Sequence, residues 1–230
     1  MVCHEHMERH IPTFEERLQQ IVNISYNLLC NKIVGGEIII FNEASLQHQL
    51  CIILKQIGIQ YLFSNSEHFS VDLEKQIPMK QQTIKSPKTA RCDIWLSMWD
   101  NEKKTVCAIE VKFFKYNKAT EATTDNRFYL LLDLENLEQY KNQAEQSILC
   151  YSIVYTNNGN YSKETTSSVI KLSPYITQHC ERELTKYIRG TNGEKIATKN
   201  VLTVNLSKEY KACWDCYNSH YFLKIDMNEI

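Results

Sequence analysis

The sequence predicts an α/β protein with a central mixed β-sheet of four to six strands flanked by helices. Three observations predict this fold class. Two segments with apolar residues at helical spacing open the chain, three segments of apolar–polar alternation follow, and a further helical segment leads into an apolar strand. The chain contains no internal repeat, low-complexity tract or linker. We therefore expect one domain, over residues 1–230, with its core at roughly 37–156 and a C-terminal extension, 157–230, of undetermined role.

The first two predicted helices have recognisable ends. The first is expected at residues 13–30, with Thr13 as the N-cap of a capping box. The second begins near Asn42, a natural cap, and carries Glu43 in its first turn, where a negative charge suits the helix dipole. Gly58 is expected to end this helix.

Three strands are expected next, because apolar and polar residues alternate at 69–77, 92–98 and 105–113. The polar residues 100–103 between the last two strands predict a hairpin turn. A helix is then expected at 127–146.

The remainder of the chain predicts a mixture of elements. A buried strand is expected at 148–155, a helix near 177–189, a strand near 201–206 and a final strand near 221–225.

Composition narrows the class of protein. A formal charge of -1 argues against a histone-like protein that coats nucleic acid by charge alone, although basic residues can still gather around one groove. Nine cysteines, an odd number at irregular spacings, indicate small core residues in a reducing compartment. The first ten residues are too polar for a secretory signal, and the apolar runs are too short for a membrane span. We expect a cytoplasmic protein with no membrane partner.

The alternation places charged residues where they need partners. Glu110 and Lys112 are two apart on a strand, so their side chains leave the same face. Asp93 lies on the neighbouring predicted strand. Two carboxylates that converge from adjacent strands repel each other unless a cation lies between them, and oxygen ligands of this kind suit Mg²⁺. A lysine beside such a site can orient or help deprotonate an attacking water and stabilise the charge of the transition state. The trio therefore predicts metal-dependent phosphodiester hydrolysis.

The arrangement Asp93-x16-Glu110-Val111-Lys112 resembles the PD-(D/E)xK nuclease superfamily, which includes many type II restriction endonucleases and repair nucleases. Its members carry this motif on a β-hairpin of a small mixed sheet, preceded by a helix that often contributes a glutamate. The resemblance covers about half of the chain, roughly residues 41–155, and implies a restriction-endonuclease-like core. Where the motif name has its proline, this chain has Cys92.

The resemblance also implies a role for each residue. Asp93 and Glu110 would bind metal, with the backbone carbonyl of Val111 as a third ligand. Lys112 would be the catalytic lysine, and Glu43 would bind a second metal or hold a metal-bound water. The cofactor would be Mg²⁺, for which Mn²⁺ can substitute, and the substrate DNA, in restriction or another defence setting. Symmetric cutting of both strands is compatible with a homodimer.

Each assignment has a plainer alternative. Glu43 could serve only the helix dipole, Glu110 and Lys112 could form a solvated ion pair on an edge strand, and Asp93 could bond to nearby backbone. The corresponding alternative function is a catalytically inactive module that binds nucleic acid or protein on a nuclease-like fold.

Basic residues before and after the motif are candidates for DNA contact through phosphates, with a solvated loop as the alternative. They are Lys80, Lys85, Lys88, Arg91 and Lys115. Gln139, on the helix after the motif, is a candidate supporting residue.

A second metal site is a weaker possibility. Cys213, Cys216 and His220 resemble half of a zinc site, for which His179 or Cys180 would have to supply a further ligand. The alternative is a strand with two small, partly buried cysteines.

Overall fold

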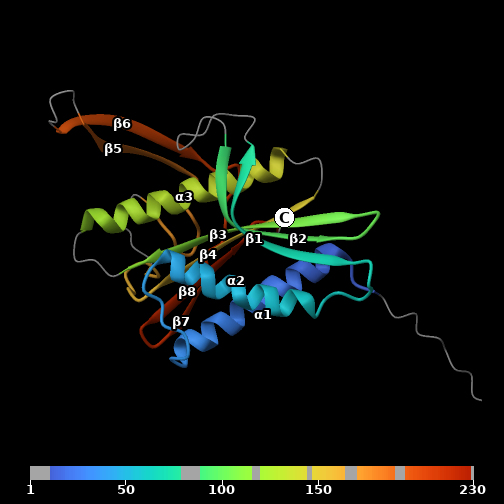
Figure 1. Cartoon of the computed structure of the whole chain (residues 1–230). Helices are drawn as coiled ribbons and strands as arrows, with labels where there is room; N and C mark the ends of the chain where they lie inside the picture. The colour runs from blue at the N-terminus through green and yellow to red at the C-terminus, as the bar shows by residue number, and fades with distance from the viewer. Residues whose placement is uncertain are drawn as a thin grey trace, which may run out of the picture.

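The computed structural model describes residues 11–78, 89–115, 120–143, 147–163, 170–189 and 195–228. Within these ranges it contains three helices and eight strands (Figure 1). The helices are α1 (Phe14–Val34), α2 (Glu43–Ile59) and α3 (Thr120–Gln143). The strands are β1 (His68–Pro78), β2 (Thr89–Trp99), β3 (Lys104–Phe114), β4 (Ile148–Thr156), β5 (His179–Arg189), β6 (Lys195–Asn205), β7 (Trp214–Tyr217) and β8 (His220–Asp226).

Six of the strands form one mixed sheet in the order β1-β2-β3-β4-β8-β7. β3 and β4 are parallel, because α3 carries the chain back across the sheet between them, and the other neighbouring pairs are antiparallel. The predicted fold class, a mixed central sheet flanked by helices, is confirmed.

The sheet separates two apolar layers. α1 and α2 cover one face and α3 covers the other (Figure 1). Along β3, Cys107, Ile109 and Val111 belong to the layer under α1 and α2, whereas Val106 and Ala108 belong to the layer under α3. Because side chains alternate along a strand, Glu110 and Lys112 continue the row that faces α3.

The predicted helix starts are confirmed by their caps. The side chain of Thr13 accepts a hydrogen bond from the backbone N–H of Glu16, and the side chain of Glu16 accepts one from the backbone N–H of Thr13. Asn42 caps α2 in the same way, with Ser45 as its partner. α3 was expected from residue 127 but begins at Thr120.

The expectation that Gly58 ends α2 is wrong by one residue. Gly58 lies inside the helix, which continues to Ile59. A Cβ at this position would overlap the ring of Phe69 on β1. The glycine therefore permits close packing of α2 on β1 and does not serve as a cap.

The three alternating segments form β1, β2 and β3, as predicted. The turn between β2 and β3 is also confirmed, since Asp100 Oδ1 accepts hydrogen bonds from the backbone N–H groups of Glu102 and Lys103. β4 and β8 contain the apolar strands expected at 148–155 and 221–225.

The prediction of a helix near residues 177–189 is wrong, because this segment forms strand β5. It pairs antiparallel with β6 in a separate two-stranded sheet, which lies beside α3 (Figure 1). Cys180 on β5 is buried and Glu181 beside it is exposed, as a half-buried strand requires. Hairpin pairing with β6, the next strand along the chain, overrides the local helical tendency of this polar segment.

No helix in the described ranges is both long enough and apolar enough to cross a bilayer.

Gly58→Ala should lower the free energy of unfolding, although alanine is the better helix former. Overpacking against Phe69 costs about 1–3 kcal/mol, which exceeds the roughly 1 kcal/mol that alanine gains over glycine in a helix. Urea unfolding measures the difference. In a Phe69→Ala background the same change should become stabilising, and a stabilising effect in the unaltered background would contradict this packing argument.

Candidate active site

Asp93 connects the two strands of the predicted motif. It lies on β2, half-buried, and its Oδ2 accepts a hydrogen bond from the backbone N–H of Val111 on β3 at 2.8 Å. The alternative in which Asp93 bonds to nearby backbone therefore describes a real contact. That contact aims the carboxyl of Asp93 along β3, toward Glu110.

Glu110 is buried, with 3% of its surface exposed, on the face of β3 that packs against α3. Burial raises the pKa of Glu110 well above its usual value, and the nearby carboxyls of Asp133 and Asp93 raise it further. The Asp93 carboxyl lies within hydrogen-bonding reach of the Glu110 carboxyl. A hydrogen bond between them requires a proton on one of the two, and the strongly raised pKa of Glu110 favours that residue. The solvated edge-strand alternative does not fit Glu110, because β3 is an interior strand of the sheet.

Lys112 is held between two carboxylates. Its Nζ lies 2.7 Å from Asp133 Oδ2 and 3.3 Å from Glu43 Oε1. Burial alone would lower the pKa of Lys112, but the charges of Asp133 and Glu43 outweigh burial and raise it. Lys112 therefore carries its positive charge at neutral pH. In this arrangement it can donate hydrogen bonds and stabilise negative charge, but it does not act as a base.

Glu43 reaches the cluster from the first residue of α2. Besides Lys112, it contacts the backbone N–H of Phe113, which donates to Glu43 Oε2 at 3.4 Å. Its side chain is 44% exposed, so one side of the cluster is open to solvent. Glu43 thus has contacts with β3 in addition to its favourable place in the first turn of a helix.

Asp133 is a site residue that the motif did not identify. It lies on α3, 4% exposed, among the buried residues Leu131, Leu132 and Leu134. A buried acidic residue between leucines of a helix needs a partner, and Lys112 is that partner. The signal was present in the sequence, but the identity of the partner was not.

Tyr140 was not singled out from the sequence. It lies two helical turns after Asp133 on the same face of α3 and is 1% exposed. Burial raises its pKa, and the charge of Glu110 raises it further, so its hydroxyl stays protonated beside the cluster. Gln139, which was predicted as a supporting residue, is turned about one-third of a turn away from the Asp133 face.

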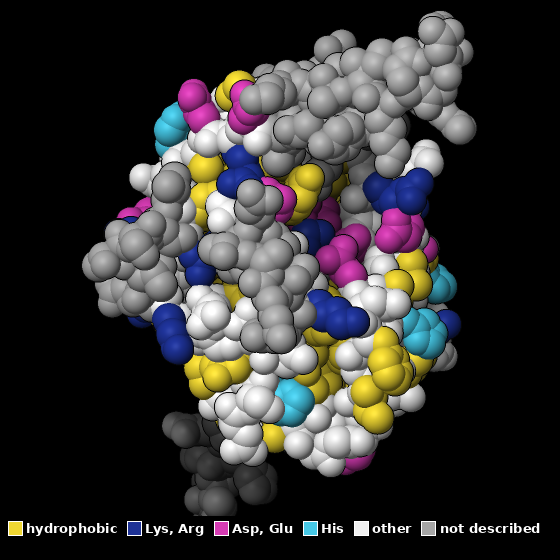
Figure 2. Space-filling view, turned by 90° about the vertical axis from the view of Figure 1, so that its left-hand side faces the viewer, with side chains coloured by type: hydrophobic (Ala, Val, Ile, Leu, Met, Phe, Trp, Pro, Cys, Tyr) yellow, Lys and Arg dark blue, Asp and Glu magenta, His cyan; other side chains and the backbone are white. Residues whose placement is uncertain are grey.

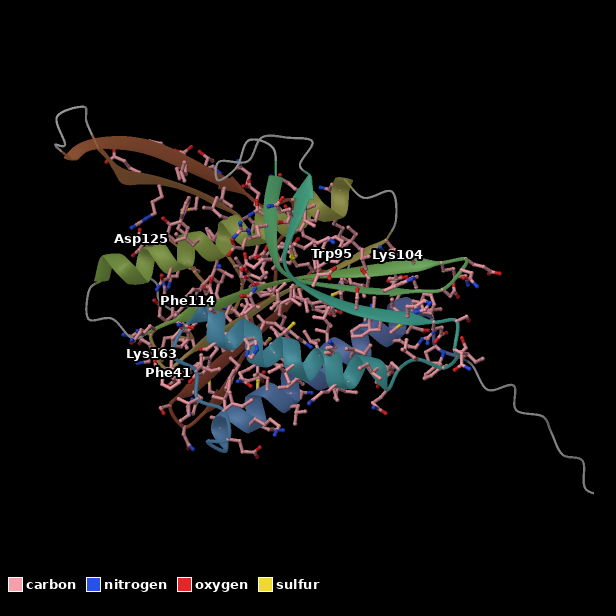
Figure 3. The ribbon with its side chains drawn as sticks, viewed as in Figure 1. Phe41, Trp95, Lys104, Phe114, Asp125 and Lys163 are labelled. Carbon is pink, nitrogen blue, oxygen red and sulfur yellow. The ribbon has the colours of Figure 1, made fainter. Side chains whose placement is uncertain are left out.

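The resulting acid–lysine cluster consists of Asp93, Glu110, Lys112, Asp133 and Glu43, contributed by β2, β3, α3 and α2. Figure 2 shows a hollow in which acidic and basic side chains lie side by side. Figure 3 labels two residues at the end of the molecule where α2 begins and β3 ends. They are Phe41, which precedes the helix cap Asn42, and Phe114, the last residue of β3.

The oxygen donors of the cluster suit a hydrated metal ion. Within the described ranges, no three histidine, cysteine or acidic side chains are arranged to hold a metal as a group. Magnesium does not need three, because it takes one or two protein carboxylates and keeps several waters. Asp93 and Glu110 are such a pair, and burial raises the pKa of both. The carbonyl of Val111, the expected third ligand, accepts a hydrogen bond from Lys112 Nζ at 3.4 Å.

The expected DNA-contact residues have different outcomes. Lys80, Lys85 and Lys88 lie outside the described residues. Arg91 is exposed and pairs with Glu74 Oε2 at 3.2 Å. Lys115 is exposed directly after β3.

The half zinc site does not assemble in the described part of the chain. Cys213 and Cys216 are exposed, and His220 Nδ1 lies 2.9 Å from the hydroxyl of Tyr155. His179 instead contacts Asn205, and Cys180 is buried.

Comparisons with known proteins add little. No family model and no curated protein matches the chain. A crystal structure of humanized D. rerio TDP2 with 14 mutations has 9% identity and a TM-score of 0.22, covering 91% of this chain and 93% of its own. One of truncated Caenorhabditis elegans TDP2 has 9% identity and a TM-score of 0.21, covering 93% of each. Similarity this low carries no argument about fold or function.

Glu110→Gln should make stability less dependent on pH in protein freed of metal by a chelator. A carboxyl with a raised pKa in the folded state stabilises fully below its unfolded value of 4.5, and this contribution is lost as pH rises. Between pH 5 and pH 8 the unaltered protein should therefore lose up to about 1.4 kcal/mol more per pH unit than the variant. Urea unfolding across this range measures the slopes. Glu102→Gln, in the exposed turn after β2, is the control, and equal slopes for all three proteins would refute the burial argument.

Proposed function

We propose that the protein is a Mg²⁺-dependent endonuclease that hydrolyses phosphodiester bonds of DNA. The observation that carries the proposal is the acid–lysine cluster, in which two neighbouring carboxyls and a charged lysine share the α3-facing side of two adjacent strands. A structural ion pair would need one acid for one lysine, whereas this cluster gathers four carboxyls around Lys112.

The arrangement of elements supports assignment to the PD-(D/E)xK superfamily. Asp93, Glu110 and Lys112 lie on the antiparallel pair β2–β3, and the preceding helix α2 supplies Glu43. This is the placement that the resemblance implies. The assignment as restriction or defence nuclease remains part of the proposal.

The charge of each residue in the cluster determines the role we propose for it. Asp93 and Glu110 would hold the metal, which when bound polarises the phosphate and lowers the pKa of water. Lys112, kept charged by Asp133 and Glu43, would donate hydrogen bonds to phosphate oxygens as negative charge builds on them. Asp133 orients the ammonium group and stays out of contact with substrate. The partly exposed Glu43 is placed to orient the attacking water from the open side of the cluster.

Binding of DNA would need cations outside the cluster as well. Lys115 extends β3 beyond Lys112 and is exposed, so it is placed to contact a phosphate along the strand. Homodimerisation, a single domain over residues 1–230 and a cytoplasmic location stay predictions.

Incubation of the purified protein with plasmid DNA and Mg²⁺ or Mn²⁺ should give strand scission, which a chelator abolishes. Glu110→Gln and Lys112→Met should each lower the cleavage rate by at least about 100-fold, the usual loss for one group that stabilises charge in a transition state. Gel analysis of the products measures it.

Lys104→Met is the matched control, because Lys104 is an exposed lysine at the other end of β3. Cleavage that survives both site variants would rule out the proposed site. Metal-independent DNA binding without scission of single- or double-stranded substrates would favour the non-catalytic binding module.

Metal binding should be visible without any substrate. Mn²⁺ should raise the melting temperature of the unaltered protein in a concentration-dependent way, because a ligand of the folded state stabilises by mass action. Asp93→Asn and Glu110→Gln should remove most of this rise, and Glu102→Gln should retain it. Thermal shift with isothermal calorimetry measures both. A rise of the same size in all four proteins would place metal binding elsewhere.

A further inference from the structure

The alternation of side chains between the two faces of the sheet is interrupted on β2 at Asp93. Cys92 and Ile94 are two residues apart and would share a face of a regular strand, yet Cys92 packs in the α3 layer and Ile94 in the α1–α2 layer. β1 is distorted at the same level, since Glu74, opposite Asp93, has a positive φ of 53°. Figure 1 shows both strands turning sharply together near the middle of the sheet. A non-glycine residue in the left-handed region persists only where its surroundings hold it.

Gln47 on α2 contacts both sides of this turn. Its Nε2 donates to the backbone carbonyl of Asp93 at 2.6 Å and to Glu74 Oε1 at 3.2 Å. Gln47 is 8% exposed, so the two contacts lie away from bulk water. An amide group has two N–H donors, and the geometry offers one acceptor for each.

The carboxylate oxygen of Glu74 that does not contact Gln47 also has a hydrogen-bond partner. Its second carboxylate oxygen, Oε2, accepts a hydrogen bond from Arg91 Nη1 at 3.2 Å. Arg91 was predicted to contact DNA, but its contact here is with Glu74. Arg91, Glu74 and Gln47 thus form a chain of contacts that ends at the backbone of Asp93.

α2 therefore reaches the cluster through two positions one helical turn apart. Glu43 contacts Lys112 and the N–H of Phe113 on β3, and Gln47 contacts Asp93 on β2. Residues four apart lie on the same face of a helix. One helix face consequently contacts both the strand that carries Asp93 and the strand that carries Lys112.

We infer that Gln47 is a positioning residue that aims the Asp93 carboxyl at the metal site. With its backbone carbonyl held by Gln47, Asp93 reaches the N–H of Val111 and the carboxyl of Glu110. The inference rests on the proposed function for its metal, but the hydrogen bond from Val111 to Asp93 can be followed without metal. Loss of Gln47 should weaken metal binding, because residues that orient a ligand typically contribute roughly 10–100-fold to metal affinity.

The test uses the full chain with Gln47→Met, which keeps the length of the side chain and removes its donors. Gln47→Asn is a second variant that keeps an amide but is one methylene too short, and it serves if the methionine variant fails to fold. Gln56→Met is the matched control, since Gln56 is an exposed glutamine on the same helix. The readouts are the ¹H–¹⁵N signal of the Val111 amide in metal-free protein and the dissociation constant for Mn²⁺ by calorimetry.

Both Gln47 variants should shift the Val111 amide signal and raise the Mn²⁺ dissociation constant about tenfold or more, with neither effect in Gln56→Met. A role confined to folding would change the melting temperature and leave the Mn²⁺ affinity of the folded protein unaltered, which would overturn the inference. An unshifted Val111 signal would overturn it too. Failure of the unaltered protein to bind Mn²⁺ would instead refute the proposed function, whatever Gln47 does to Val111.

Discussion

The charge balance around Lys112 is the constraint on which the site depends. One ammonium group lies among four carboxyls, and the nearest of them, Asp133, is almost fully buried beside it. Removing charges from water is costly, and a single cation cannot compensate four anions. The surplus is relieved in one of two ways, by a proton on Glu110 or by an added cation. The raised pKa of Glu110 corresponds to the added proton, and metal binding would supply the added cation.

The fold builds this cluster from ordinary elements. Alternation along β3 places Glu110 and Lys112 on the face toward α3. The crossover through α3, which makes β3 and β4 parallel, carries Asp133 over that same face. The capped start of α2 brings Glu43 to the end of β3. The apolar layers on either side of the sheet then hold the groups at fixed distances without any single long loop.

The sequence could predict what depends on local pattern. Strand alternation predicted that Glu110 and Lys112 share a face, and the caps predicted where α1 and α2 begin. Contacts between distant segments were not predictable in this way. Asp133 stands 21 residues beyond Lys112, and Gln47 stands 46 before Asp93. The error at β5 has another cause, because its strand conformation depends on hairpin pairing with β6, the next strand along the chain, and not on its own periodicity.

The chemistry of the cluster also bears on how a substrate could approach. A phosphate that nears four carboxyls and one lysine meets net negative charge, and the chain as a whole, at -1, offers no general attraction for DNA. Arg91, one of the basic residues closest to the motif, has its charge partly offset by Glu74. A divalent cation between Asp93 and Glu110 would cancel most of this negative charge, which Lys112 alone cannot do. In such a site the metal is needed for the phosphate to bind as much as for the bond to break, so affinity for DNA at the cluster and catalysis should depend on the same ion.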